Sequence, residues 1–120
     1  MAISVQSPGV AGSGFIKNAT SADASACEEI IAAPAAGISH YIEKVKITSD
    51  AAITVTIGAG ETAGAVTTAL IGPVSFAANQ TISWEFSGRS KALKVTAATS
   101  LTVDSSGAGN ICVFVQGYTE

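Results

Sequence analysis

Short segments in which apolar and polar residues alternate constrain the fold of this chain more than any other feature. Ile53, Val55 and Ile57 are separated by threonines, and Ile82 and Trp84 are separated by a serine. Successive side chains of a β-strand point to opposite faces, so a period of two residues predicts strands with one buried face. The sequence therefore predicts an all-β protein.

Turn residues separate these segments at intervals of about 8–12 residues, the spacing typical of sandwiches and barrels. We expect a single-domain, jelly-roll-like β-sandwich of about eight short antiparallel strands. The expected strands cover residues 26–32, 41–48, 53–57, 66–71 with a short continuation at 74–76, 82–86, 93–96, 101–103 and 111–115. Gly58–Gly64 is expected to be a loop that makes a hairpin turn, and the continuously apolar Ile111–Val115 a strand covered on both faces.

Residues 1–24 are rich in serine, glycine and alanine and lack sustained periodicity. We expect an extended N-terminal arm there, with a short strand at Gly14–Lys17, followed by the sandwich domain over residues 25–120. Isolated apolar side chains in the arm could dock against a neighbouring subunit or a capsid, with the backbone adding to a sheet edge. These candidate partner-binding residues are Ile3, Val5, Val10, Phe15 and Ile16. The alternative is a tail without a binding role.

The apolar residues that share the period of two should form the core. They are Val45, Ile47, Ile53, Val55, Ile57, Ile82, Trp84, Phe86, Leu93, Val95, Val113 and Val115. Burial of Trp84 favours a structural protein, whereas its exposure favours a module that stacks aromatic rings against a sugar.

Composition argues against several classes of protein. Charged residues make up 12% of the chain, against about 25% in a typical globular domain, and the net charge is −3. The scattered basic residues are unfavourable for binding nucleic acid through its phosphates. The longest apolar run is far below the ~20 residues of a membrane span, and the N-terminus lacks the features of a secretory signal. We expect a protein made in the cytoplasm, with neither nucleic acid nor membrane as a partner.

The residue types needed for catalysis are scarce. His40 is the sole histidine and has no nucleophile motif nearby, so we expect a structural or surface role. Gly58–Gly64 matches neither the phosphate-binding nor the dinucleotide-binding pattern of glycines. Cys27 and Cys112 are expected to be buried free thiols, with one disulfide between them as the alternative. One histidine and two distant cysteines cannot supply a zinc site. We therefore predict a non-enzymatic protein without a catalytic site, cofactor or metal.

Several segments carry a resemblance to a known family. The run Ile30–Gly37 and the strand at 41–48 are followed by SDAAITVTIGAG, LIGPVSFAANQTISWEF and KALKVTAATSLTVDSSGAGNICVFVQGY. In the order of strands, turns and small residues, residues 26–118 resemble the small structural proteins of tailed-bacteriophage virions, and above all the head decoration (cement) proteins.

The resemblance implies a β-sandwich or jelly roll that forms a homotrimer on the outer surface of the capsid. There it would bind the major capsid protein, and no catalytic residues are carried over. Its location would be the virion, after synthesis in the host cytoplasm. The alternative is a tail-fibre, spike or other host-recognition module on the same kind of sandwich, which binds a host-surface glycan through exposed aromatic residues such as Tyr41 or Tyr118.

Overall fold

The computed structural model describes residues 13–86 and 91–120, which form nine β-strands. The strands are β1 (Ser13–Ser21), β2 (Glu28–Ile31), β3 (His40–Ser49), β4 (Thr54–Thr62), β5 (Ala65–Ser75), β6 (Gln80–Glu85), β7 (Leu93–Lys94), β8 (Leu101–Ser105) and β9 (Ile111–Thr119). Their pairings are antiparallel throughout. Within these ranges, no helix has the length and apolar character needed to cross a membrane.

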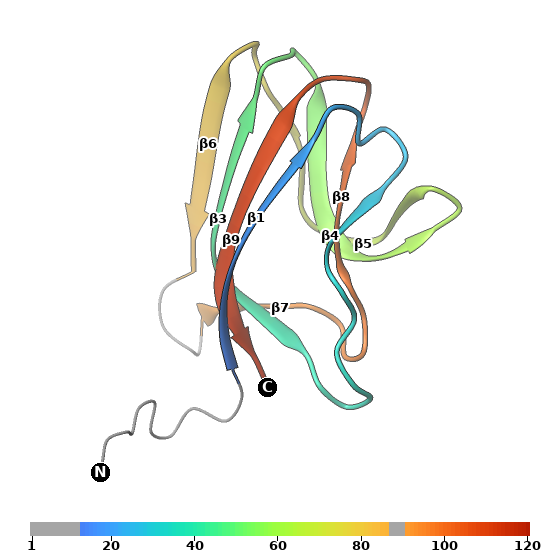
Figure 1. The fold of residues 1–120 in the computed structure, drawn as a ribbon, viewed down its shortest axis with the longest axis vertical. Coiled ribbons are helices and arrows are strands. Elements are labelled where there is room, and N and C mark those ends of the chain that lie inside the picture. The colour runs from blue at the N-terminus through green and yellow to red at the C-terminus, as the bar shows by residue number, and fades with distance from the viewer. Residues whose placement is uncertain (1–12, 87–90) are drawn as a thin grey trace.

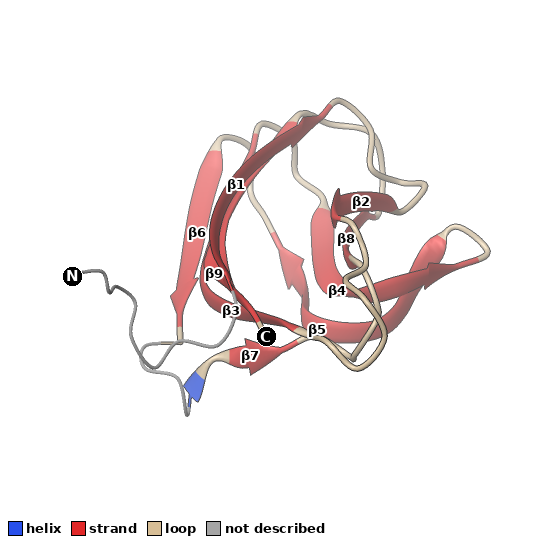
Figure 2. Cartoon of the chain, turned by 60° about the horizontal axis from the view of Figure 1, so that its bottom comes forward, coloured by secondary structure: helices blue, strands red, loops and turns tan. Residues whose placement is uncertain are grey.

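The strands form two sheets that face each other as the layers of a sandwich (Figures 1 and 2). Sheet A has the order β1-β9-β3-β6, with β7 also paired to β3, and sheet B has the order β2-β8-β4-β5. The chain alternates between the sheets from β1 to β4. On its return it places β6 beside β3, β8 between β2 and β4, and β9 between β1 and β3. Two interleaved antiparallel sheets of this kind form a jelly-roll sandwich, which confirms the expected fold class.

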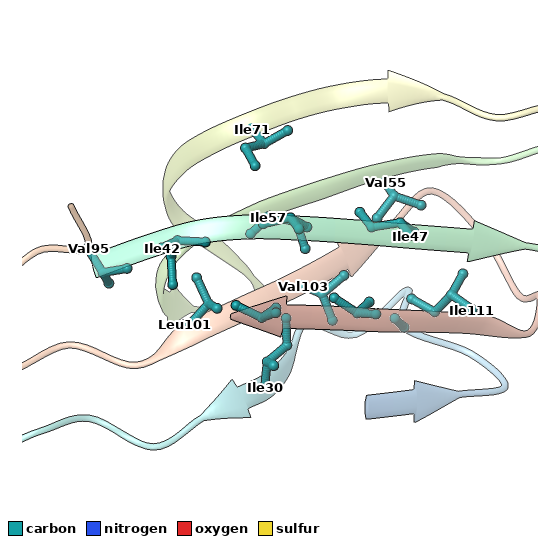
Figure 3. Close-up of a cluster of buried hydrophobic side chains, with 14 of the residues drawn as sticks. Ile30, Ile42, Ile47, Val55, Ile57, Ile71, Val95, Leu101, Val103 and Ile111 are labelled. Atoms are coloured by element: carbon teal, nitrogen blue, oxygen red, sulfur yellow. The ribbon is translucent and has the colours of Figure 1, made fainter. Parts of the chain in front are cut away.

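The core lies between the sheets, where their inward-facing side chains meet (Figure 3). Seven of the expected core residues are buried: Val45, Ile47, Val55, Ile57, Val95, Val113 and Val115. Five others are half-buried and pack against this cluster: Ile53, Ile82, Trp84, Phe86 and Leu93. Ile82 and Trp84 belong to β6, which lies at an edge of sheet A and so has a strand neighbour on one side only. Burial at this edge is therefore partial.

Strand β1 corrects the expected extent of the N-terminal arm. Residues 13–21 form an edge strand of sheet A, and each residue pairs with β9, from Ser13 opposite Thr119 to Ser21 opposite Ile111. The polar stretch after Lys17 concealed this strand, because only Phe15 and Ala19 of β1 pack against the core. Residues 13–21 therefore belong to the sandwich. Residues 1–12 lie outside the described residues.

A tight β-hairpin replaces most of the loop expected at Gly58–Gly64. Strand β4 continues to Thr62 and β5 begins at Ala65, so only Ala63 and Gly64 form the turn. Both have positive φ, 54° and 81°, as a two-residue type I′ turn requires. Gly58 lies within β4, where a β-carbon would collide with the side chain of Val66 on the other arm of the hairpin. Glycine is needed here for close packing within a strand.

Candidate functional site

The outer face of sheet A presents ordered rows of side chains. Cross-strand pairing aligns one residue from each of β1, β9, β3 and β6, in that order, in each row across the sheet. The three central rows are Ile16–Gln116–Lys44–Glu85, Asn18–Phe114–Lys46–Ser83 and Thr20–Cys112–Thr48–Thr81. They alternate along β9 with Val113 and Val115, which are buried in the core. Because side chains alternate between the faces of a strand, the rows point away from the core.

A shallow depression of about 350 Å³ lies in this face. It is lined by Asn18, Lys44, Lys46, Thr48, Cys112 and Phe114. Phe114 is half-buried in the central row, opposite Asn18 on β1 and Lys46 on β3. Ile16 on the same face is 69% exposed. An apolar centre with amide, hydroxyl and ammonium groups around it is suited to contact with another protein or with a sugar.

The exposure of Cys112 corrects the expectation that Ile111–Val115 is covered on both faces. Ile111, Val113 and Val115 are buried between the sheets, but Cys112 is exposed and Phe114 is only half-buried. The inner side chains of this segment fill the core, while the outer Cys112 and Phe114 are apolar as well. Apolar surface on the outside of a central strand is a candidate contact site.

Lysines determine the charge of this face. Lys44 Nζ lies 3.7 Å from Glu85 Oε2, and the two side chains are 41% and 64% exposed. An exposed pair of this kind contributes at most about 1 kcal/mol. Lys46 lies between Phe114 and Ser83, so its row contains no carboxylate. The depression therefore has an ammonium group available to a negatively charged partner.

The two described candidate partner-binding residues have separate roles. Phe15 is half-buried and packs against the core, and its ring makes an edge-to-face contact with His40 at 5.7 Å between centroids. Ile16 points to the outer face of sheet A, in the row of Lys44. Ile3, Val5 and Val10 lie outside the described residues. Of the two described residues, Ile16 is therefore the one placed where a partner can reach it.

His40 is held by both of its ring nitrogens. Its Nε2 lies 2.8 Å from the carbonyl oxygen of Ala32, and its Nδ1 lies 2.9 Å from Thr119 Oγ1. A carbonyl oxygen only accepts, so Nε2 donates to Ala32, while Nδ1 shares a hydrogen bond with the Thr119 hydroxyl. His40 is 5% exposed, and it joins the start of β3 to the end of β9. This geometry supports a structural role.

The aromatic residues considered for sugar binding are not freely exposed. Tyr41 and Tyr118 stack on each other, with ring centroids 4.9 Å apart and planes 8° apart. Tyr118 is 6% exposed. Trp84 is half-buried against the core, opposite Val45. Phe114, which we did not single out from the sequence, is a further ring on the outer face of sheet A, and it is half-buried.

Cys27 lies beside sheet B and is a free thiol, as is Cys112, so the alternative of a disulfide between them is wrong. The Cys27 backbone N–H donates to the Gly64 carbonyl at 3.0 Å, which ties it to the β4–β5 turn. Burial raises the pKa of the Cys27 thiol, a hydrogen bond with Thr102 opposes that shift, and three carboxylates raise it further. They belong to Asp104, Glu61 and Glu28. Cys27 therefore remains a protonated, weakly nucleophilic thiol at neutral pH.

Strand order explains why the sequence did not reveal this surface. Cys112 and Phe114 are alternate residues of β9 and so lie on one face of that strand. Lys44, Lys46 and Thr48 are alternate residues of β3 and lie on one face in the same way. This alternation assigns residues to a face of their own strand, but it does not identify which strands are neighbours in the sheet. That β9 lies between β1 and β3 follows from the fold alone.

No protein-family model, curated protein or solved structure matches this chain. Among the described residues, no three histidine, cysteine, aspartate or glutamate side chains lie together as metal ligands would.

Proposed function

We propose that this chain is a non-enzymatic structural protein of a tailed-phage virion, a homotrimeric decoration protein of the head. In this role it binds the major capsid protein on the outer surface and stabilises the shell. The resemblance of residues 26–118 to that family supports the proposal. Jelly rolls occur in viral capsid proteins and in lectins, which is an analogy at the level of fold.

The outer face of sheet A is the observation that carries the proposal. Phe114 and Cys112 leave apolar surface on a central strand, and Ile16 extends it toward the edge at β1. The surrounding groups are mostly hydroxyls and amides, which are desolvated at a lower cost than charges on association. A trimer that presents three such faces would gain avidity from several weak contacts.

The state of His40 and Cys27 supports a non-enzymatic role. Both nitrogens of His40 are engaged in hydrogen bonds within the fold. Burial and nearby carboxylates raise the pKa of Cys27, which keeps its thiol protonated. Neither residue has the exposure and activation that a catalytic base or nucleophile needs.

Electron microscopy tests the location directly. Gold-labelled antibodies against the purified chain should decorate the heads of the source virions. Labelling confined to tails or fibres would refute the decoration role.

A co-sedimentation assay with undecorated capsids tests the surface. Binding should be saturable, and Phe114→Ser should weaken it by about tenfold or more, as expected for loss of an apolar anchor. Thr68→Ala, an exposed change on β5, is the matched control and should bind as the parent does. Equal binding by all three proteins would exclude the outer face of sheet A as the contact site.

The N-terminal segment enters the proposal as a second attachment element. Deleting residues 2–12 leaves β1 intact, so the sandwich should keep its unfolding free energy. Trimer formation or capsid binding should weaken if Ile3, Val5 and Val10 dock on a partner. Unchanged trimer mass and capsid affinity would leave the segment without an attachment role.

A glycan-binding module is the second candidate, and Phe114 is the observation that favours it. A half-buried ring beside Asn18 and Thr48 combines a stacking surface with hydrogen-bonding groups. Binding to immobilised host glycans that Phe114→Ser abolishes, together with gold labelling of tails, would establish this role in place of decoration.

A further inference from the structure

The charges of the sandwich are divided between its two sheets. Every lysine in a described strand belongs to sheet A: Lys17, Lys44, Lys46 and Lys94. The strands of sheet B contain no lysine or arginine, and their acidic residues are Glu28, Glu29, Glu61 and Asp104. The strands of sheet A also contain Glu43 and Glu85, so they carry four lysines against two carboxylates, an excess of positive charge within a chain whose net charge is −3.

The positive side coincides with the apolar depression. Lys44 and Lys46 line it beside Phe114, and Lys94 extends the same side at the position opposite Tyr41. In the rows of the outer face, Glu85 is the single carboxylate, and it is already paired with Lys44. Lys46 thus has no carboxylate partner among the residues of these rows. The surface offers apolar area and positive charge together.

The acidic residues of sheet B also gather on one surface. The hydrogen bond from Cys27 N–H to the Gly64 carbonyl brings the β4–β5 turn beside β2. Glu61 Oε2 accepts from Gly64 N–H at 3.0 Å in that turn. Asp104 alternates along β8 with the inward-facing Val103, so it points to the outer side of sheet B. Glu29 and Glu61 are exposed, and we call these two residues and Asp104 the acidic surface.

We propose that copies of this chain associate head to tail, with the depression of sheet A in one copy receiving the acidic surface of sheet B in the next. The charges of the two surfaces are complementary, and both are present in one chain. Two different surfaces meet in this contact, so it is heterologous, and a series of copies closes into a ring when the rotation between copies permits. The inference rests on the proposed self-association and assigns its surfaces: the next copy occupies the depression, and the capsid contact falls to the rest of the outer face of sheet A, which includes Ile16.

Charge reversal tests the contact in both partners. Lys44→Glu/Lys46→Glu and Glu29→Lys/Glu61→Lys should each weaken self-association by about tenfold or more, because like charges then face each other. An equimolar mixture of the two variants should restore complexes in which the variants alternate, since both contacts between unlike copies then pair opposite charges. Mass is measured by sedimentation velocity, and circular dichroism verifies folding. Raising NaCl from about 0.05 to about 0.5 M should weaken the parent's association.

Lys17→Glu is the matched control. It makes one such charge reversal on an exposed residue of sheet A, but Lys17 pairs with Val115 in an inward-facing row and not in the rows of the depression. This variant should associate like the parent. Equal weakening by Lys17→Glu, or a mixture that fails to restore complexes, would overturn the proposed contact.

Cys112 supplies an independent readout, because it lines the depression and is exposed in the single chain. In a Cys27→Ser background, thiol labelling of Cys112 should slow severalfold as protein concentration rises through the association range. With Lys44→Glu/Lys46→Glu added, the rate should not depend on concentration. A parent that forms oligomers without protecting Cys112, or that remains monomeric throughout, would also overturn the inference.

The outcomes separate this inference from the proposed function. Virion heads labelled by antibody, with self-association insensitive to charge reversal, would support decoration and refute this contact. Antibody labelling of tails, together with complexes restored by mixing the two charge-reversal variants, would support the contact and refute decoration. If the Lys44 and Lys46 changes weaken capsid binding but leave self-association unchanged, the depression binds the capsid protein. That outcome would refute self-association through the depression.

Discussion

The α-carbon of Gly117 lies so close to the carbonyl group of Tyr41 that a β-carbon at Gly117 would occupy the space of the carbonyl oxygen. The register of β3 against β9 shifts between Ile42 and Lys44, next to this contact. Such a bulge bends its strand and increases the local twist, which brings the two backbones together. The close approach at Gly117 therefore accompanies an irregularity in the centre of sheet A.

Replacing Gly117 should destabilise the fold. Gly117→Ala forces the backbones of β9 and β3 apart, with an expected loss of roughly 1–3 kcal/mol in the free energy of unfolding. Gly14→Ala is the control, because a β-carbon there would meet its nearest neighbour, the Gly117 carbonyl, at 3.7 Å. Urea denaturation measures both. Equal stability of the two variants would show that the contact at Gly117 is looser than described.

Two isoleucines test which faces are buried. Ile42 is 0% exposed and Ile16 is 69% exposed. Ile42→Ala should cost about 2–5 kcal/mol of unfolding free energy, because it removes buried methyl groups and leaves a cavity. Ile16→Ala should change stability by less than about 0.5 kcal/mol. A large loss from Ile16→Ala at concentrations where the chain is monomeric would contradict its outward position.

The two thiols should differ in reactivity. The sequence led us to expect both to be slow, but the exposure of Cys112 predicts rapid labelling of the dilute protein, while Cys27 reacts slowly. Burial raises the pKa of Cys27 most, and nearby carboxylates raise it further. The pH at which its labelling rate increases should therefore be higher in the folded protein than in the protein unfolded by urea. Asp104→Asn should move the folded profile to lower pH. Single-cysteine variants and a colorimetric disulfide reagent give each rate, and the reverse order of reactivity would contradict the placement of both thiols.

Removal of the His40 ring should weaken the end of sheet A. His40→Ala leaves the Ala32 carbonyl without its donor and opens a cavity beside Phe15, with an expected cost of roughly 2–4 kcal/mol. Thr119→Val removes only the hydroxyl partner and should cost about 1 kcal/mol. Thermal unfolding compares the two variants. A neutral His40→Ala would mean that the ring does not join these strands.

The alternation of residues predicted the sandwich because burial on one face is a local property of a strand. Val45, Ile47, Val55 and Ile57 are buried as their period required. The same pattern did not predict burial of Ile42. The bulge at Glu43 inserts one residue between the inward-facing Ile42 and Val45, so the alternation of buried side chains is shifted there. A bulge depends on the partner strand and leaves no mark in the alternation itself.

Features set by contacts between distant segments escaped prediction. Glycines at 58 and 60 suggested a loop, although Gly58 is required by the side chain of Val66 across the hairpin. The unbroken apolar run around Cys112 suggested cover on both faces, although the described residues leave the outer side of β9 exposed. The depression around Phe114 needed the order of four strands, which hydrophobic periodicity does not encode.

Strand β9 is the last of the nine along the chain, yet it lies in the middle of sheet A between β1 and β3. During synthesis, β1 and β3 leave the ribosome long before the segment that must join them. Sheet A can therefore assemble only at a late stage, through pairing of segments that are far apart in sequence, and such pairing folds slowly. Until then the nascent chain carries unpaired strand edges and uncovered apolar side chains, which are the features that recruit chaperones or lead to aggregation.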